Sequence, residues 1–199
     1  MKKAFCGMVL AMMFTVAALA SPNGLQKQAE KRMKPVLLVI DIQNEYLSMV
    51  PEREKEVALY MINAAIELFR ENGFPVIRVY HTDLKYGPKP DTEAFEFPKS
   101  VMIKPEDPRI IKNYPNAFKK TDLEKMLRDR GCNTLFLCGL RAVGCVLATY
   151  HGAADLDFDV FMLKDAIMSH NSAYTDSIED IFSALGYGAL KVMLEYAQK

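Results

Sequence analysis

The sequence predicts a single α/β domain in which a mostly parallel sheet is covered by helices on both faces, a three-layer α/β/α arrangement. Short apolar segments of strand length alternate along the chain with segments of helical periodicity, an order that requires crossover connections between parallel strands. When the first 20 of the 199 residues are set aside, 179 remain. That length suits one domain with its own hydrophobic core.

Residues 1–20 have the features of a secretory signal rather than of a folded element. Two lysines precede an apolar run that ends in the small residues of a cleavage site before Ser21. An uncleaved anchor is the alternative, because the run is only a little shorter than the roughly 20 residues that span a bilayer. We expect cleavage, a single folded domain over residues 21–199, and a secreted or periplasmic protein with no stable membrane association.

The charge balance excludes some classes of partner. The chain has 25 basic and 25 acidic residues, and loss of the two signal lysines leaves a net charge of about −2. Such a balance offers no electrostatic attraction to nucleic acid or to an anionic membrane surface. The glycine signatures of nucleotide-binding loops are also absent. We therefore expect a small-molecule partner and no nucleic acid.

The first half of the domain begins with the strand "PVLLVIDI", whose continuous apolar run is typical of a strand covered on both faces. A helix is predicted over Glu52–Asn72, since its apolar residues follow helical spacing and Gly73 lies where helices commonly end. "PVIRVYH" is the second strand. Residues 84–100 are rich in proline and charge and predict a long loop, either a lid over a site or a solvated excursion.

The second half continues the alternation. "RIIKNY" is a short strand, "TDLEKMLRDRG" a helix and "NTLFLCGL" a buried strand. A helix over about Gly144–Asp155, the strand "DVFMLKDA", a helix over about Ala173–Leu185 and a last strand near "LKVMLEY" follow. Six strands result, with neither a second domain nor an internal repeat.

Three reactive residues follow different strands of this predicted sheet: Asp41, Lys112 and Cys145. Chemistry in open α/β sheets gathers at the carboxyl ends of the strands, so we expect these side chains to converge. Cys145 opens a helix, whose N-terminal partial charge favours the nucleophilic thiolate. Each residue alone also has a structural explanation: a small buried thiol, a locally paired carboxylate, a solvated lysine. Their joint placement favours a catalytic site.

The cysteine count adds a question about this site. The domain keeps Cys132, Cys138 and Cys145, an odd number, so one thiol must stay unpaired in a monomer. Cys138 ends a strand and Cys145 starts the next helix, so a bridge between them is open from sequence. That bridge would abolish the proposed nucleophile.

Four motifs in order resemble those of the isochorismatase-like cysteine hydrolases. They are "LLVIDIQNEY", "IIKNYPNAF", "LFLCGLRAVGCV" and "VFMLKDA", and the resemblance covers nearly all of the domain. It is to the amidase branch, related to nicotinamidases and carbamoylsarcosine amidases. The resemblance implies a six-stranded, largely parallel sheet.

The resemblance also implies a mechanism. Asp41 would take the thiol proton, Cys145 would attack an amide or carbamoyl carbon to give a thioester, and Lys112 would hold the charges in place. The family usually has a cis peptide at the position of Leu140–Arg141. The amides of Arg141 and Cys145 would then form the oxyanion hole.

Four further residues fall at positions that the resemblance or their place at a strand end assigns to substrate contact: Gln43, Tyr46, His81 and Phe118. Relatives commonly form homo-oligomers, and we expect one here. No cofactor is implied.

Two departures from the family pattern affect these expectations. Ala142, Val143 and Gly144 stand where the family commonly carries Thr and then Asp or Asn, so side chains that brace the loop are lost. Nicotinamidases bind a metal after the second strand, where this chain has only "HTDL", and its three histidines show no zinc spacing. We expect no metal, which disfavours nicotinamide as substrate.

Three hypotheses follow. The first is a secreted, metal-independent amidase acting on a small amide, ureido or carbamoyl compound. The second is a vinyl ether hydrolase of the isochorismatase type, against which Cys145 counts because those enzymes typically lack the cysteine. The third is a non-catalytic binding protein, a hypothesis suggested by the altered loop before Cys145. If it holds, we expect Cys145 to alkylate no faster than a model thiol.

Overall fold

The computed structural model describes residues 32–83, 85 and 87–198 of the chain. The predicted signal segment, residues 1–20, lies outside the described residues, so secretion and the cleavage site stay predictions. Within the described residues, no helix combines the length and the apolar character needed to cross a membrane.

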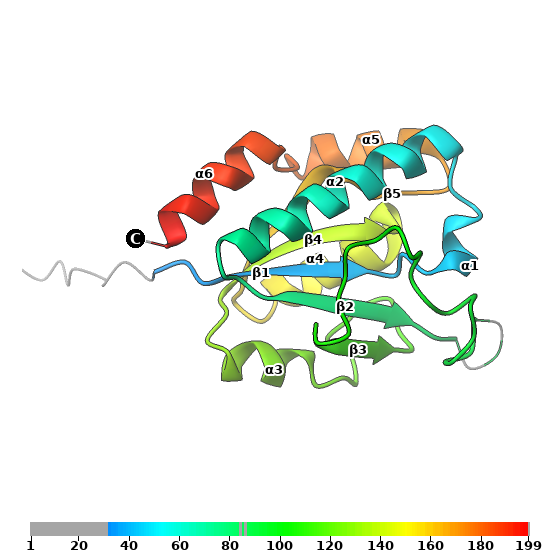
Figure 1. Ribbon diagram of the computed structural model, residues 1–199, viewed down its shortest axis with the longest axis horizontal. Helices are drawn as coiled ribbons and strands as arrows, with labels where there is room; N and C mark the ends of the chain where they lie inside the picture. The colour runs from blue at the N-terminus through cyan, green and yellow to red at the C-terminus, as the bar shows by residue number, and fades with distance from the viewer. Residues whose placement is uncertain (1–31, 84, 86, 199) are drawn as a thin grey trace, which may run out of the picture. The chain divides into compact units, whose positions relative to one another are not determined.

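A five-stranded sheet forms the centre of the domain (Figure 1), and its strand order is β3-β2-β1-β4-β5. Each neighbouring pair is parallel. The predicted α/β class is thereby confirmed. The strands are β1 (Pro35–Ile40), β2 (Val76–His81), β3 (Arg109–Lys112), β4 (Thr134–Leu140) and β5 (Asp159–Met168).

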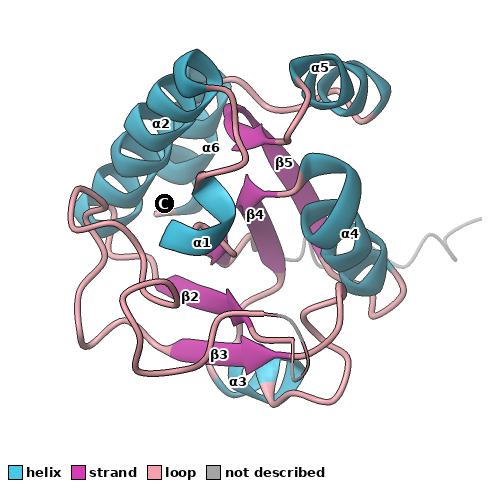
Figure 2. Ribbon diagram, turned by 90° about the vertical axis from the view of Figure 1, so that its right-hand side faces the viewer, coloured by secondary structure: helices cyan, strands magenta, loops and turns pink. Residues whose placement is uncertain are grey.

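Helices cover both faces of this sheet, as the sequence predicted. Figure 2 shows α2 and α6 on one side and α4 on the other. Buried residues of α3 and α4 join the core on the side away from α2 and α6. The helices are α1 (Asn44–Leu47), α2 (Glu52–Glu71), α3 (Leu123–Asp129), η1 (Ala142–Val146), α4 (Leu147–Ala154), α5 (Ser172–Ile181) and α6 (Tyr187–Ala197).

The strand β1 shows why its sequence lacks polar residues. Leu37 and Val39 enter the core under α2, whereas Val36, Leu38 and Ile40 enter the opposite core. All five are fully buried. Burying such a side chain stabilises a fold by about 1.5–3 kcal/mol. In a strand with two buried faces, a polar residue at any position would therefore cost folding free energy.

The predicted sixth strand is wrong, because "LKVMLEY" lies in α6. Leu190, Leu194 and Ala197 are buried on one side of that helix, at the spacing of helical turns. Beside β5, where a sixth strand would add to the sheet, the structure has a parallel bridge between Leu163 and Leu185. The helix α5 ends four residues before Leu185, so the chain is extended where this bridge forms.

The second half of the long loop after β2 is packed against the domain. Phe95 and Phe97 are buried and stack on Tyr80, with ring centroids 5.0 and 4.2 Å apart. The amide of Asn44 donates a hydrogen bond to the carbonyl of Glu96 at 2.9 Å. This half of the loop is therefore part of the core rather than a mobile lid.

Candidate active site

A buried ion pair links the ends of two strands that are not neighbours. Lys112, the last residue of β3, is fully buried, and its Nζ lies 2.6 Å from Oδ2 of Asp41, the residue after β1. The strand β2 lies between β3 and β1, so the lysine side chain passes the end of β2 to reach the carboxylate. Asp41 is also almost fully buried and has a positive φ of 53°, a conformation that aspartate tolerates better than most residues.

His81 is the residue that the lysine passes. His81 is paired with Lys112 in the sheet register, and its Nδ1 lies 3.0 Å from Lys112 Nζ. An ammonium group only donates, so Nδ1 accepts and the proton of the imidazole is on Nε2. Burial lowers the pKa of His81, and the nearby Lys112 charge acts in the same direction. The ring is therefore neutral and presents an N–H donor.

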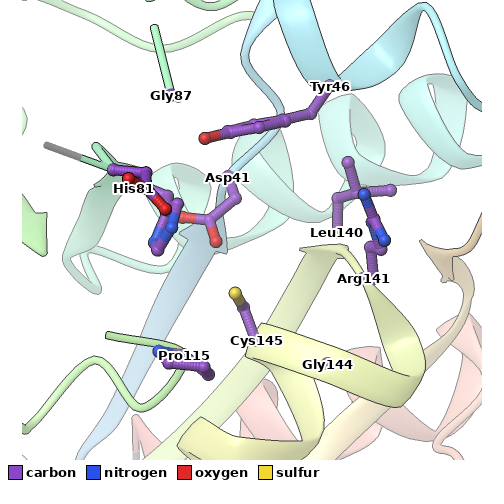
Figure 3. A pocket seen from close by; sticks show the side chains of 10 residues that line it. Asp41, Tyr46, His81, Gly87, Pro115, Leu140, Arg141, Gly144 and Cys145 are labelled. Carbon is purple, nitrogen blue, oxygen red and sulfur yellow. The ribbon is translucent and has the colours of Figure 1, made fainter. Parts of the chain in front are cut away.

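The thiol of Cys145 completes the cluster. Its side chain points toward the carboxylate of Asp41 (Figure 3). One ligand atom from each of Asp41, His81 and Cys145 lies within 4.8 Å of the other two. The structure thus brings together the three residues that the sequence singled out, with His81 beside them.

The electrostatics of this thiol differ from the prediction. Burial raises the pKa of Cys145 to about 12, and the Asp41 charge adds to the effect while Lys112 opposes it. These effects favour a protonated thiol at rest over the expected thiolate. The chain before Cys145 is kinked at Gly144, whose backbone is not helical (φ −126°, ψ −107°), and the sulfur faces the carboxylate of Asp41 (Figure 3).

The carboxylate of Asp41 is the acceptor beside this thiol. Burial raises the pKa of Asp41, against the opposing effect of Lys112. Its Oδ2 accepts from Lys112, whereas its buried Oδ1 accepts no hydrogen bond of regular geometry among the described residues. The thiol of Cys145 is the donor that interacts with this carboxylate and lowers its pKa, against the larger effect of burial. A buried acceptor without a partner costs free energy unless something donates to it. The arrangement suits an atom that receives a proton during a reaction.

The nucleophile loop is held by its own backbone. The peptide between Leu140 and Arg141 is cis, as the resemblance implied. The Arg141 carbonyl accepts hydrogen bonds from the amides of Gly144 and Val146, at 2.9 and 3.1 Å. These bonds brace the loop where the family's polar side chains are missing: Ala142 is buried, and the side chain at 143 is an exposed valine. The oxyanion role of the Arg141 and Cys145 amides stays a prediction.

A cavity of about 310 Å³ opens above these groups. It includes Tyr46 and His81, as predicted, while Asp83 and Gly87 are contributed by the first part of the long loop. Sequence reasoning did not place Asp83, Gly87 or Pro115 there, although "HTDL" and the proline inside "IIKNYPNAF" were visible signals. The lining consists of Asp41, Tyr46, His81, Asp83, Gly87, Pro115, Leu140, Arg141, Gly144 and Cys145.

Gln43 and Phe118 do not line this cavity, so their predicted substrate contacts are wrong. Gln43 is fully buried, donates to the His81 carbonyl at 3.0 Å and accepts from the His81 amide at 2.7 Å. It therefore fixes the end of β2 and positions the imidazole. Phe118 is partly buried and stacks on Phe158, with ring centroids 5.8 Å apart, against the core to which α3 and α4 contribute.

The open question of a disulfide is answered by the faces of the sheet. Cys132, Cys138 and Cys145 are all free. Cys138 belongs to the core under α2, whereas Cys145 packs against the opposite core. The sheet separates the two sulfurs, so the thiol of Cys145 is available.

Asp41, His81 and Cys145 are also the group that could hold a metal ion by proximity. The Lys112 ammonium already contacts Asp41 at 2.6 Å and His81 at 3.0 Å. Because a metal ion would share two of its ligands with this cation, the lysine opposes metal binding. The residues present fit an ammonium-centred cluster better than a metal centre.

A buried acid, a lysine and a thiol at the carboxyl edge of a parallel sheet define a hydrolase-type site, and comparison with known proteins gives the family. A family model for the isochorismatase domain matches residues 35–188. The chain therefore belongs to the isochorismatase family, whose members are hydrolases.

Individual relatives agree with this assignment. The chain is 30% identical over 155 residues to the uncharacterised isochorismatase family protein YddQ of Bacillus subtilis, covering 73% of this chain and 84% of that protein. An isochorismatase family protein from Burkholderia thailandensis has a similar structure, with a TM-score of 0.73 and 24% identity over 81% of this chain and 96% of its own. N-carbamoylsarcosine amidase from Thermoplasma acidophilum has a TM-score of 0.64 and 24% identity over 77% of this chain and 95% of its own.

Proposed function

We propose that this protein is a cysteine-dependent amidohydrolase that cleaves a C–N bond in a small amide, ureido or carbamoyl compound. The observation that carries the proposal is the buried carboxylate of Asp41 beside the thiol of Cys145, with its Oδ1 not used by any other hydrogen bond among the described residues. The fold shared with N-carbamoylsarcosine amidase supports an amidase-type reaction. The cavity of about 310 Å³ limits the substrate to a small molecule, on the order of ten water volumes.

The first half of the reaction forms a thioester. Oδ1 of Asp41 takes the proton of Cys145 as the sulfur attacks the carbonyl carbon, and the carbonyl electrons move to the oxygen. Because the pKa of the thiol is raised, proton transfer and C–S bond formation occur together rather than through a resting thiolate. The tetrahedral intermediate then expels ammonia or an amine, which takes the proton back from Asp41.

The second half regenerates the thiol. Water gives a proton to Asp41 as its oxygen attacks the thioester carbon. The C–S bond then breaks to release an acid, and the leaving sulfur takes the proton back from Asp41. Lys112 stays bonded to Oδ2 throughout and keeps Oδ1 directed at the reacting groups. In this proposal the amides of Arg141 and Cys145 stabilise the oxyanion in both halves.

The proposal is tested with Cys145→Ala and the matched control Cys132→Ala. The control removes a buried sulfur that precedes β4, at the end of this strand opposite to the cavity. Ammonia release from a panel of small amides and ureido compounds should vanish in the first variant and persist in the second. Mass spectrometry of rapidly quenched wild-type enzyme should show an acyl adduct on Cys145. Equal ammonia release from both variants would refute the proposal, and pyruvate formation from isochorismate would favour the vinyl ether alternative.

The location and assembly of the protein are part of the proposal. We infer a secreted or periplasmic homo-oligomer whose chain begins at Ser21 after signal cleavage. The mass of the protein recovered from the native host tests the cleavage, and light scattering tests the assembly. An intact mass that includes residues 1–20 would instead favour the anchor.

A further inference from the structure

Arg141 is a cation at the cavity that has no anionic partner in the described part of the chain. Its side chain is half-buried, and none of the ion pairs among the described residues includes it. Its Nη2 lies 3.9 Å from Sδ of Met49, and a thioether is only a weak acceptor. The guanidinium therefore keeps most of its donors for a ligand.

The other charges at the cavity lie away from this guanidinium. The Asp41 charge is offset by Lys112 at 2.6 Å. Asp83 follows the end of β2, and its charge acts to raise the pKa of His81 on that side. Arg141 follows β4, and β1 separates β2 from β4. With about 4.8 Å between neighbouring strands, the acidic and basic ends are roughly 10 Å apart.

The nucleophile lies between these two ends. Figure 3 shows His81 and Arg141 on opposite sides of Cys145 and Asp41. A carbonyl carbon above the sulfur therefore has the guanidinium on its β4 side. Arginine matches a carboxylate through two parallel N–H···O bonds. A neutral substrate would cover the guanidinium without supplying an anion, whereas a carboxylate would pair with it.

We propose that Arg141 selects substrates in which the small amide or ureido group is carried by a carboxylic acid, with the carboxylate bound to its guanidinium. This inference rests on the proposed amidase function and names the substrate class. The cavity of about 310 Å³ places the carboxylate only a few bonds from the scissile carbon. Arg141 then has two roles. Its side chain sets the substrate specificity, and its backbone amide is the predicted donor to the oxyanion.

The test compares an acid with its neutral ester, namely succinamate and N-carbamoylglycine with their methyl esters. The readout is the ratio of kcat/KM for acid over ester, measured by ammonia release. Wild-type protein should favour the acid by about tenfold or more, the size expected for a charged hydrogen bond. Arg141→Gln should bring the ratio close to one, and Arg141→Lys should retain part of it. Arg130→Gln, which removes an exposed charge at the end of α3, should leave the ratio unchanged.

A ratio that is the same in wild type and Arg141→Gln would overturn the inference and leave the amidase proposal intact. Failure to cleave any of the four compounds would count against the proposed function for this class, and binding then decides the role of Arg141. Calorimetry with succinate should show affinity for wild type and Arg130→Gln that falls about tenfold or more in Arg141→Gln. Equal affinity in the three proteins, or no binding to wild type, would overturn the inference.

Discussion

Replacing Lys112 with methionine tests the electrostatic design of the site. Methionine keeps an unbranched side chain of similar length but removes the ammonium that contacts Asp41 at 2.6 Å. Asp41 would remain almost fully buried without its cation. Breaking a buried pair by removing one partner typically costs about 3–5 kcal/mol of folding free energy.

Protonation of Asp41 limits that cost. An unperturbed Asp has a pKa of about 3.9, and each pH unit corresponds to about 1.36 kcal/mol, so neutralising the carboxyl at pH 7 costs about 4 kcal/mol. The pKa of Asp41, already raised by burial, rises further without Lys112. Below its wild-type pKa the carboxyl is protonated in both proteins, and the difference is small. Above that pKa the difference grows by up to about 1.36 kcal/mol per pH unit until the variant's own pKa is reached.

Urea unfolding of wild type and Lys112→Met at pH 5, 6, 7 and 8 measures this dependence. We expect a loss of less than about 4 kcal/mol at pH 7 that shrinks as the pH falls toward the wild-type pKa of Asp41. Two controls isolate the cause. The double variant Asp41→Asn, Lys112→Met should recover much of the stability, because both charges are gone. Lys125→Met breaks an ion pair of the same 2.6 Å length that is exposed, and should change stability little. A loss that does not vary with pH, or equal losses at Lys112 and Lys125, would refute the reasoning.

The remaining predictions concern the thiol, a glycine and a buried amide. Cys145 should react with iodoacetamide more slowly than a model thiol at pH 7, with a rate that still rises at pH 10, because its pKa is about 12; a plateau near pH 8 would contradict this. Gly139→Ala places a Cβ 2.0 Å from a backbone oxygen of β1 at a φ of +113°, so folded yield should collapse, whereas Gly186→Ala meets nothing within 4 Å and should fold normally. Gln43→Leu leaves two backbone groups of His81 unpaired and should cost about 1–3 kcal/mol per group in urea unfolding; an unchanged midpoint would show that water replaces the amide.

The order of strands and helices was predictable from the spacing of apolar residues. A buried parallel strand is a short continuous apolar run, whereas an amphipathic helix repeats its apolar residues every three to four positions. The last segment failed for a physical reason. Residues 190–196 are apolar enough to suit a strand, and only the burial of Leu190 and Leu194 under α2 shows that the helical period governs. Local apolar content does not reveal which element a short segment will pack against.

The candidate site was predictable at the level of strand ends and not at the level of side-chain direction. Asp41, Lys112 and Cys145 converge because parallel strands bring their carboxyl ends to one edge. Gln43 lies two residues beyond Asp41 yet turns away from the cavity to bind the backbone of His81. A polar residue just beyond a strand end is predicted to lie near the site. Hydrogen bonds inside the fold decide whether its side chain can contact a substrate.

The raised pKa of Cys145 changes what a slowly reacting thiol means in this protein. A sluggish reaction with iodoacetamide was the expected sign of a binding protein, on the premise that a catalytic thiol rests as thiolate. In this structure burial and Asp41 hold the proton on sulfur, while the acceptor that can remove it, the carboxylate of Asp41, lies beside the thiol. Activation then depends on a carbonyl carbon being present to take the sulfur lone pair as the proton leaves. Only a reaction that requires substrate, such as acylation of Cys145 by an amide, can separate the enzyme from the binding protein.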